Sequence, residues 1–156
     1  MRRPGLRGIG CLTAICLALL PSTARGQTTA DTVAVTNSLA RYASLAERMA
    51  SDSIGALYLD DGEMAGTGQA PVKGPKAISA FLHTFDAYRV LSETMTSDRL
   101  RFRADTAIQG GNFVQRVQLP AGDTVVARGT FEVTWVKSGT TGWRVRRMTT
   151  GPAPVN

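Results

Sequence analysis

The chain has 156 residues, of which 43% are apolar and 19% charged, and it contains 16 Gly and 7 Pro. This length and composition exclude a collagen-like repeat, a long coiled coil, a wholly disordered chain and a large multidomain enzyme. The formal charge of +6 comes from 18 basic and 12 acidic residues, but four of the arginines lie in residues 1–26, which contain no acid. The rest of the chain therefore carries only +2 and does not indicate a nucleic-acid-binding protein.

Residues 1–26 have the three-part layout of a secretory signal peptide. Arginines at its start precede a twelve-residue apolar run, Ile9–Leu20, and small residues follow that run. The run is shorter than the roughly 20 residues that a membrane-spanning helix needs. We expect cleavage near Gly26, or after Ala24, and export to the periplasm or the medium with no membrane attachment afterwards. A retained anchor and, because of the arginine pair Arg2-Arg3, the twin-arginine route are the alternatives.

Both cysteines, Cys11 and Cys16, lie in this leader and not directly after its apolar run, so lipidation is not expected. The exported chain would contain no cysteine, which excludes disulfides, thiolate catalysis and cysteine metal sites. His83 is the only histidine, and its predicted position on a helix surface makes it a solvated side chain. Transition-metal sites usually need several nitrogen or sulfur ligands, so we expect no metal and no cofactor.

The first half of the chain after the leader has helical periodicity. Residues 27–34 are small and polar, and we expect a flexible N-terminal segment there. From Val33 to Met49 apolar residues recur at spacings of three and four, which predicts an amphipathic helix. Asp52 is a suitable N-cap for a second, short helix that carries Tyr58 and ends at the following Asp-Asp-Gly.

The second half changes to the periodicity of strands. Pro75 predicts the first turn of a third helix whose apolar face includes Phe85, and after about Tyr88 the apolar period falls from 3.6 to 2. Strand-like runs cover residues 98–105, 112–119, 125–136 and 143–149, with turn signals at Gly110-Gly111, Pro120–Asp123 and Ser138-Gly139. Helices followed by short-linked strands predict an α+β domain with an antiparallel sheet. The tail, residues 150–156, is expected to be disordered.

The last two strands allow a prediction of register. If their apolar side chains share one face, Trp135 lies opposite Trp143 and Val133 lies opposite Val145. The same pairing places Glu132 on the other face and Arg147 opposite Phe131, on the apolar face. An arginine there would need a carboxylate, the sheet edge or an anionic ligand group as its partner.

Several local motifs, in order, resemble the SnoaL-like branch of the nuclear transport factor 2-like superfamily over about residues 35–149. The motifs are Tyr58-Leu59-Asp60-Asp61 after the short helix, Gly74-Pro75-Lys76-Ala77-Ile78 at the entry of the third helix, and a tryptophan-bearing hairpin at 129–137 and 142–145. The resemblance implies an α+β domain in which N-terminal helices pack on a curved antiparallel sheet to form a cone with an apolar pocket, a cystatin-like α+β barrel. It also implies a homodimer formed through the sheet.

Members of this superfamily include polyketide cyclases, ketosteroid isomerase, epoxide hydrolases, dehydratases and many exported proteins with no known reaction, so fold alone does not identify the chemistry. We expect an exported domain that binds a small apolar ligand. An isomerase, cyclase or hydrolase of a small apolar substrate and a dimeric protein-interaction module are the alternatives. The candidate ligand-binding residues are Tyr42, Tyr58, Trp135 and Arg147, although either tyrosine and the tryptophan could equally be core.

No catalytic residue can be assigned from the pattern. The carboxylates of the strand half are Glu93, Asp98, Asp105, Asp123 and Glu132, and none is predicted to lie on the concave face. The basic run Arg99, Arg101 and Arg103 has no interleaved aromatic residues and indicates a solvated strand face or dimer rim, not a phosphate or nucleic-acid site.

Overall fold

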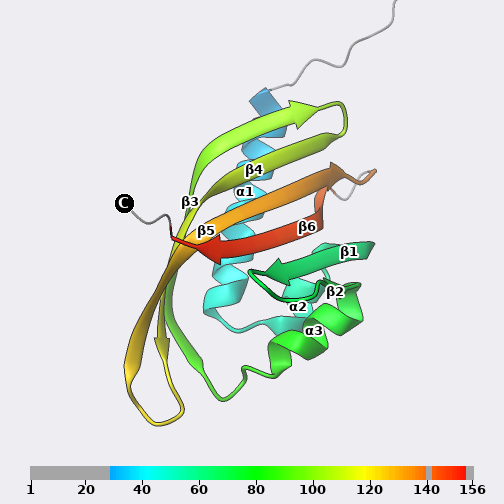
Figure 1. Cartoon of the computed structure of the whole chain (residues 1–156). Coiled ribbons are helices and arrows are strands. Elements are labelled where there is room, and N and C mark those ends of the chain that lie inside the picture. The colour runs from blue at the N-terminus through cyan, green and yellow to red at the C-terminus, as the bar shows by residue number, and fades with distance from the viewer. Residues whose placement is uncertain (1–28, 140–141, 154–156) are drawn as a thin grey trace, which may run out of the picture.

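The structure is a computed structural model that describes residues 29–139 and 142–153. The predicted leader and its cleavage near Gly26 lie outside these residues. Three helices are present, α1 (Thr29–Glu47), α2 (Ser51–Gly55) and α3 (Pro75–His83) (Figure 1). The strands are β1 (Tyr58–Gly66), β2 (Val72–Lys73), β3 (Arg89–Arg103), β4 (Thr106–Gln118), β5 (Thr124–Lys137) and β6 (Trp143–Pro152).

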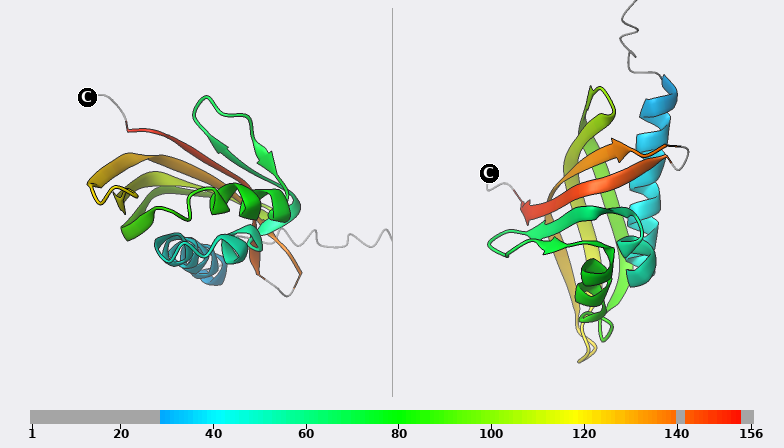
Figure 2. Two further views of the ribbon diagram at one scale, coloured as in Figure 1. Left: turned by 90° about the horizontal axis from the view of Figure 1, so that it is seen from below. Right: turned by 90° about the vertical axis from the view of Figure 1, so that its right-hand side faces the viewer.

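The strands form one sheet in the order β2-β1-β6-β5-β4-β3. The sheet curves, and the helices lie on its concave side (Figure 2). This arrangement confirms the predicted α+β class. The sheet is mixed and not wholly antiparallel, because β1 pairs in parallel with β6, and it is open, because β2 and β3 form its two edges.

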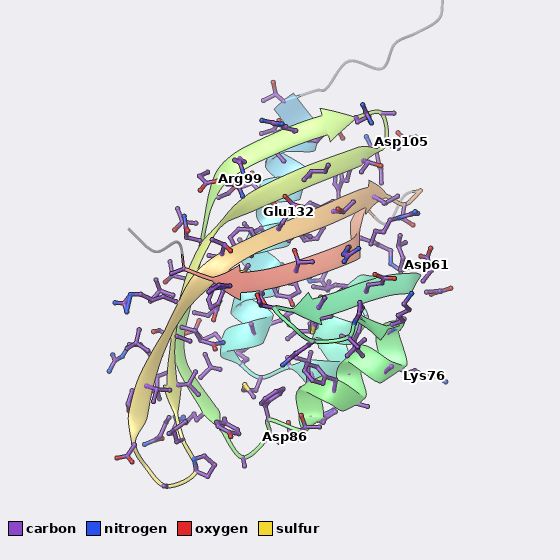
Figure 3. The ribbon with its side chains drawn as sticks, viewed as in Figure 1. Asp61, Lys76, Asp86, Arg99, Asp105 and Glu132 are labelled. Carbon is purple, nitrogen blue, oxygen red and sulfur yellow. The ribbon has the colours of Figure 1, made fainter. Side chains whose placement is uncertain are left out.

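The hydrophobic core lies between α1 and the central strands. Alternate residues of β5, Phe131, Val133 and Trp135, are almost fully buried, whereas Glu132 between them is exposed. Figure 3 shows Glu132 on the face of the sheet that is turned away from α1. The indole Nε1 of Trp135 donates to Oε1 of Gln109 at 3.0 Å, so the two buried polar groups satisfy each other.

The helices differ in their bounds from the sequence prediction. α1 begins at Thr29, so most of the segment expected to be flexible is helical, and an ion pair of 2.6 Å between Asp31 and Lys137 of β5 holds its first turn. α2 ends at Gly55, where a Cβ would come within 2.6 Å of the Pro75 carbonyl oxygen of α3. Tyr58 was predicted to lie on this second helix. It instead begins β1, the strand that pairs with β6.

Gly110-Gly111 is not a turn, contrary to the prediction. Both glycines lie inside β4, and they allow the neighbouring strand β3 to approach closely. A Cβ on Gly111 would lie 2.0 Å from the Thr96 carbonyl oxygen, and one on Gly110 would meet the Arg99 guanidinium at 2.5 Å. The turn between β3 and β4 falls instead at Ala104, which has a positive φ of 49°.

The predicted register of the last hairpin is wrong by two positions. Trp135 pairs with Val145, and Lys137 pairs with Trp143. A bulge then shifts the register again, so that Thr134 lies opposite Arg147 and Phe131 lies opposite Thr150, not Arg147. β6 continues to Pro152, so the start of the tail that was predicted to be disordered is paired with β5.

We predict that Gly111→Ala destabilises the protein by about 2 kcal/mol or more, because the new methyl group would overlap the backbone of β3. Chemical denaturation measures the free energy of unfolding. Val114→Ala, on the exposed face of the same strand, is the control and should cost less than about 1 kcal/mol. Equal stability of Gly111→Ala and wild type would contradict the close approach.

Candidate functional site

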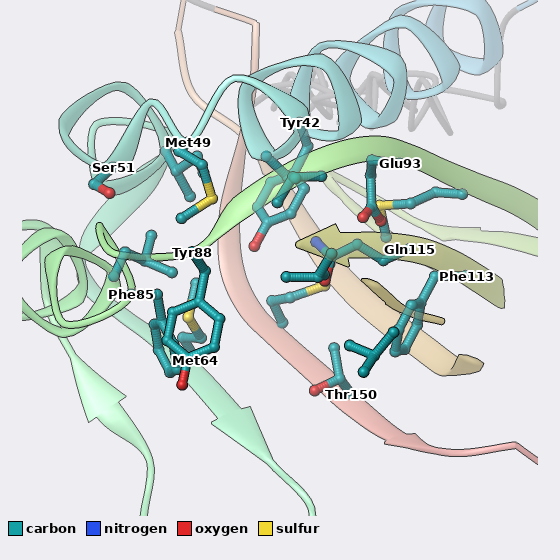
Figure 4. Close-up of a pocket in the computed structure, with 18 of the residues that line it drawn as sticks. Tyr42, Met49, Ser51, Met64, Phe85, Tyr88, Glu93, Phe113, Gln115 and Thr150 are labelled. Atoms are coloured by element: carbon teal, nitrogen blue, oxygen red, sulfur yellow. The ribbon is translucent and has the colours of Figure 1, made fainter. Parts of the chain in front are cut away.

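A cavity of about 460 Å³ lies between the concave face of the sheet and the helices (Figure 4). Most of its wall is aliphatic, aromatic or thioether. The lining residues with polar side-chain atoms are Tyr42, Ser51, Tyr88, Glu93, Gln115 and Thr150. A cavity of this size and character, with a few convergent polar groups, is typical of a site for a small organic molecule.

Two tyrosine hydroxyls lie close together near the C-terminal end of α1. Tyr42 on α1 and Tyr58 at the start of β1 are both buried, and their hydroxyl oxygens are 3.3 Å apart. Burial raises the pKa of Tyr42 to about 12 and the pKa of Tyr58 well above its usual value, so both are neutral phenols. When Tyr58 donates to Tyr42, the Tyr42 hydroxyl is free to donate into the cavity, toward which it points in Figure 4.

Glu93 reaches the cavity because β3 is irregular. A register shift between Val90 and Ser92 puts Val90, Glu93 and Met95 on the concave face, where all three line the cavity. Glu93 lies opposite Gln115 of β4, whose side chain hydrogen-bonds to the carboxylate. The Oε2 atom of Glu93 is buried and has no hydrogen-bond partner among the described residues.

The surroundings of Glu93 favour its neutral form. Burial is the largest cause, and the negative charge of Glu47 on α1 adds to it, whereas the hydrogen bond from Gln115 acts in the opposite direction. Together they raise the pKa of Glu93 to about 7. A half-buried carboxyl group with this pKa can accept or donate a proton near neutral pH, which is the property required of a general acid–base group.

One member of this site is a residue that the sequence pattern predicted, and another is not. Tyr42 lines the cavity, as a candidate residue should. Glu93 was not predicted to lie on the concave face, although strict alternation places it between the apolar residues Leu91 and Met95. This local signal was incomplete, because the irregularity between Val90 and Ser92 puts Val90 and not Leu91 in the cavity wall beside Glu93.

The other three candidates lie outside the cavity wall. Tyr58 contributes through its hydroxyl contact with Tyr42, and Trp135 is a core residue. Arg147 does not face the apolar side: it is exposed and lies 3.8 Å from Glu63, which also pairs with Lys73 at 2.8 Å. Arg147 therefore does not need an anionic ligand as its partner.

A second group of polar side chains lies on the surface between α2 and α3. Asp52 accepts a hydrogen bond from Ser79 and contacts Nε2 of His83 at 3.3 Å, and Nδ1 of His83 contacts Asp86 at 2.9 Å. The two carboxylates raise the pKa of His83, Asp86 contributing more than Asp52. No group of three or more His, Cys, Asp or Glu within the described residues could hold a metal ion, and none of the described helices is long and apolar enough to cross a membrane.

Because the pKa of Glu93 is raised, we predict that the free energy of unfolding depends on pH. Between pH 4.5, the ordinary pKa of a glutamate, and about pH 7, the folded protein holds a proton on Glu93 that the unfolded chain has released. The free energy of unfolding therefore falls as the pH rises through this window. Solvent screening at the partly exposed carboxyl reduces the difference to on the order of 1–2 kcal/mol.

Glu93→Gln should remove this contribution and gain stability relative to wild type from about pH 4.5 to pH 7. Urea denaturation at several pH values measures it. Glu132→Gln, on the exposed face of the sheet, is the control and should keep the wild-type pH dependence. A constant difference between Glu93→Gln and wild type across this window would show that the carboxyl is not perturbed.

The fold has many relatives among solved structures. An NTF2-like protein with a cystatin-like fold from Novosphingobium aromaticivorans is 21% identical, with a TM-score of 0.67, over 81% of this chain and 84% of that chain. A ketosteroid isomerase-like protein from Erwinia carotovora atroseptica is 18% identical, with a TM-score of 0.73, over 82% of this chain and all of that chain. A conserved protein from Planctomyces limnophilus is 16% identical, with a TM-score of 0.72, over 82% and 100%. These likenesses show the fold.

A search of curated proteins finds no match to the chain. The sequence pattern of the SnoaL-like domain, in contrast, matches residues 27–149. This match includes every helix and nearly every strand residue that the structure describes, together with all the described cavity-lining residues except Thr150. The chain therefore belongs to the SnoaL-like domain family.

Proposed function

We propose that the protein binds a small, largely apolar molecule in the cavity between the sheet and the helices. The observation that carries the proposal is the cavity itself, about 460 Å³ in volume and mostly apolar, with Tyr42, Glu93 and Gln115 as a polar end. Burying the apolar body of a ligand would supply most of the affinity, and the polar end would orient it.

Filling the cavity should abolish this binding. Val117 lines the cavity, and Val117→Trp adds a large ring to its wall. We expect its affinity for the neutral fluorescent dye Nile red to fall by about tenfold or more, because the ring occupies the volume that the dye needs. Fluorescence titration measures the affinity, and circular dichroism checks that the variant is folded.

The matched control is Val114→Trp, which adds the same ring to the exposed face of the same strand. It should bind the dye as wild type does. Equal affinity of Val117→Trp and wild type would contradict binding in this cavity, and so would a failure of the wild-type protein to bind any apolar probe.

A second candidate function is proton-transfer catalysis on a small apolar carbonyl compound. Glu93 favours it, since this residue lines the cavity and its pKa is about 7. The ketosteroid isomerase-like relative is consistent with this candidate, although at 18% identity it shows only the shared fold. In this reaction Glu93 would remove a proton from the carbon beside the carbonyl, and the Tyr42 hydroxyl would donate to the carbonyl oxygen.

Exchange of the α-hydrogens of β-tetralone in D2O, followed by NMR, tests this second function. Wild type should accelerate the exchange. The rate with Glu93→Gln should be about 100-fold or more below the wild-type rate, because the amide oxygen of glutamine is a much weaker base than a carboxylate. Glu132→Gln should retain the wild-type rate. Exchange no faster than in buffer would exclude this chemistry and leave the binding proposal in place.

A further inference from the structure

The described side chains that line the cavity include an acidic group but no basic group. Glu93 is the only carboxylate among the described residues that line it, and no Lys, Arg or His occurs in the lining. The Oε2 atom of Glu93 is buried and has no partner among the described side chains and backbone groups. A buried carboxylate oxygen is costly unless a donor meets it, and a positively charged donor makes the strongest such hydrogen bond.

The rest of the cavity lining is rich in thioether and aromatic groups. The sequence has five methionines, and the four that follow Met1 all line the cavity. They come from four different parts of the fold, and are Met49, Met64, Met95 and Met148. Four aromatic rings, those of Tyr42, Phe85, Tyr88 and Phe113, line the same space. Thioether sulfur makes favourable contacts with aromatic rings, and aromatic faces attract ammonium groups.

From these two observations we propose that the ligand is an arylalkylamine, an apolar aromatic ring that carries an amino group on an alkyl carbon, whose ammonium group binds the carboxylate of Glu93 and whose ring lies against the methionines. The proposal rests on the function proposed above and narrows its ligand class. The carboxylate of Glu93 accepts a hydrogen bond from the ammonium group, and the Gln115 amide oxygen and the Tyr42 hydroxyl, which line the same cavity, are further acceptors. An apolar carboxylic acid is disfavoured, since its anion would face Glu93 with no basic residue in the lining to compensate.

Charge pairing gives this binding mode a characteristic pH dependence. The titratable groups that act on Glu93 are Tyr42 and Glu47, both from α1. Burial raises the pKa of Tyr42 to about 12, whereas the pKa of Glu93 is about 7, so Glu93 is the lining group that changes charge near neutral pH. An alkylamine is protonated below roughly pH 10. The affinity for an amine should therefore rise between about pH 6 and pH 8, as Glu93 ionises.

Three probes with one aromatic body separate the ligand classes: naphthylmethylamine, naphthylmethanol and naphthoate. Isothermal titration calorimetry on the whole protein measures each affinity at about pH 6 and pH 8. We expect the amine to bind about tenfold more tightly than the alcohol at the higher pH, and naphthoate to bind most weakly. The preference for the amine should be smaller at the lower pH, where Glu93 holds its proton.

Two variants test whether the preference for the amine depends on the carboxylate of Glu93. Glu93→Gln should reduce the amine affinity about tenfold or more at the higher pH and remove the pH dependence, while leaving the alcohol affinity within a few-fold of wild type. Glu132→Gln, which removes an equal charge from the opposite face of the sheet, should change none of these affinities. Thermal unfolding of both variants checks that they are folded.

Some results would overturn the proposal. If the alcohol or naphthoate bound as tightly as the amine, or if Glu93→Gln kept the amine affinity, the assignment of an amine would be wrong while binding in the cavity stood. If Nile red bound wild type but the amine did not, the ligand class alone would fail. If neither Nile red nor any naphthyl probe bound, the proposed function itself would fail.

Discussion

Strands β3, β4 and β5 of this protein are longer than the helices that cover them, and the cavity follows from that mismatch. The fifteen residues of β3 extend over about 50 Å, whereas the nine residues of α3 extend over about 14 Å. Where α1 crosses the sheet, Phe131, Val133 and Trp135 fill the space between the layers. Beyond the end of α1 the curved strands continue with only short helices above them, so side chains there line a hollow and do not close it.

The polar end of the cavity is built at the expense of stability. Glu93 buries a carboxylate oxygen that has no hydrogen-bond partner among the described residues, and such oxygens are unfavourable in an apolar interior. Tyr42 and Tyr58 similarly keep two hydroxyls away from water with only each other as the described partner. Groups of this kind gather where a protein recognises or transforms a ligand, and here Glu93 and Tyr42 line the same, mostly apolar cavity.

The bulges explain which parts of the site were predictable. Tyr42 could be placed on the inner face of α1 from spacing alone, since the helical period holds along the whole helix. Glu93 and Arg147 could not be placed in the same way, because each lies beside an irregularity in its strand: between Val90 and Ser92 in β3, and at the Thr134–Trp135 step where β5 pairs with β6. One extra residue in a strand reverses the face of every residue beyond it, and no local pattern marks where it is inserted.

The sequence by itself determined the α+β class, the buried face of β5 and the position of Tyr42. All of these depend on periodicity within one element, which neighbouring residues encode. Only the tertiary structure decided that Tyr58 begins a strand, that Gly110-Gly111 lies within one, that Arg147 faces away from the core and that Glu93 enters the cavity. Each of these depends on how two strands or two helices meet, and that contact is selected by the packing energy of the whole fold and not by local propensity.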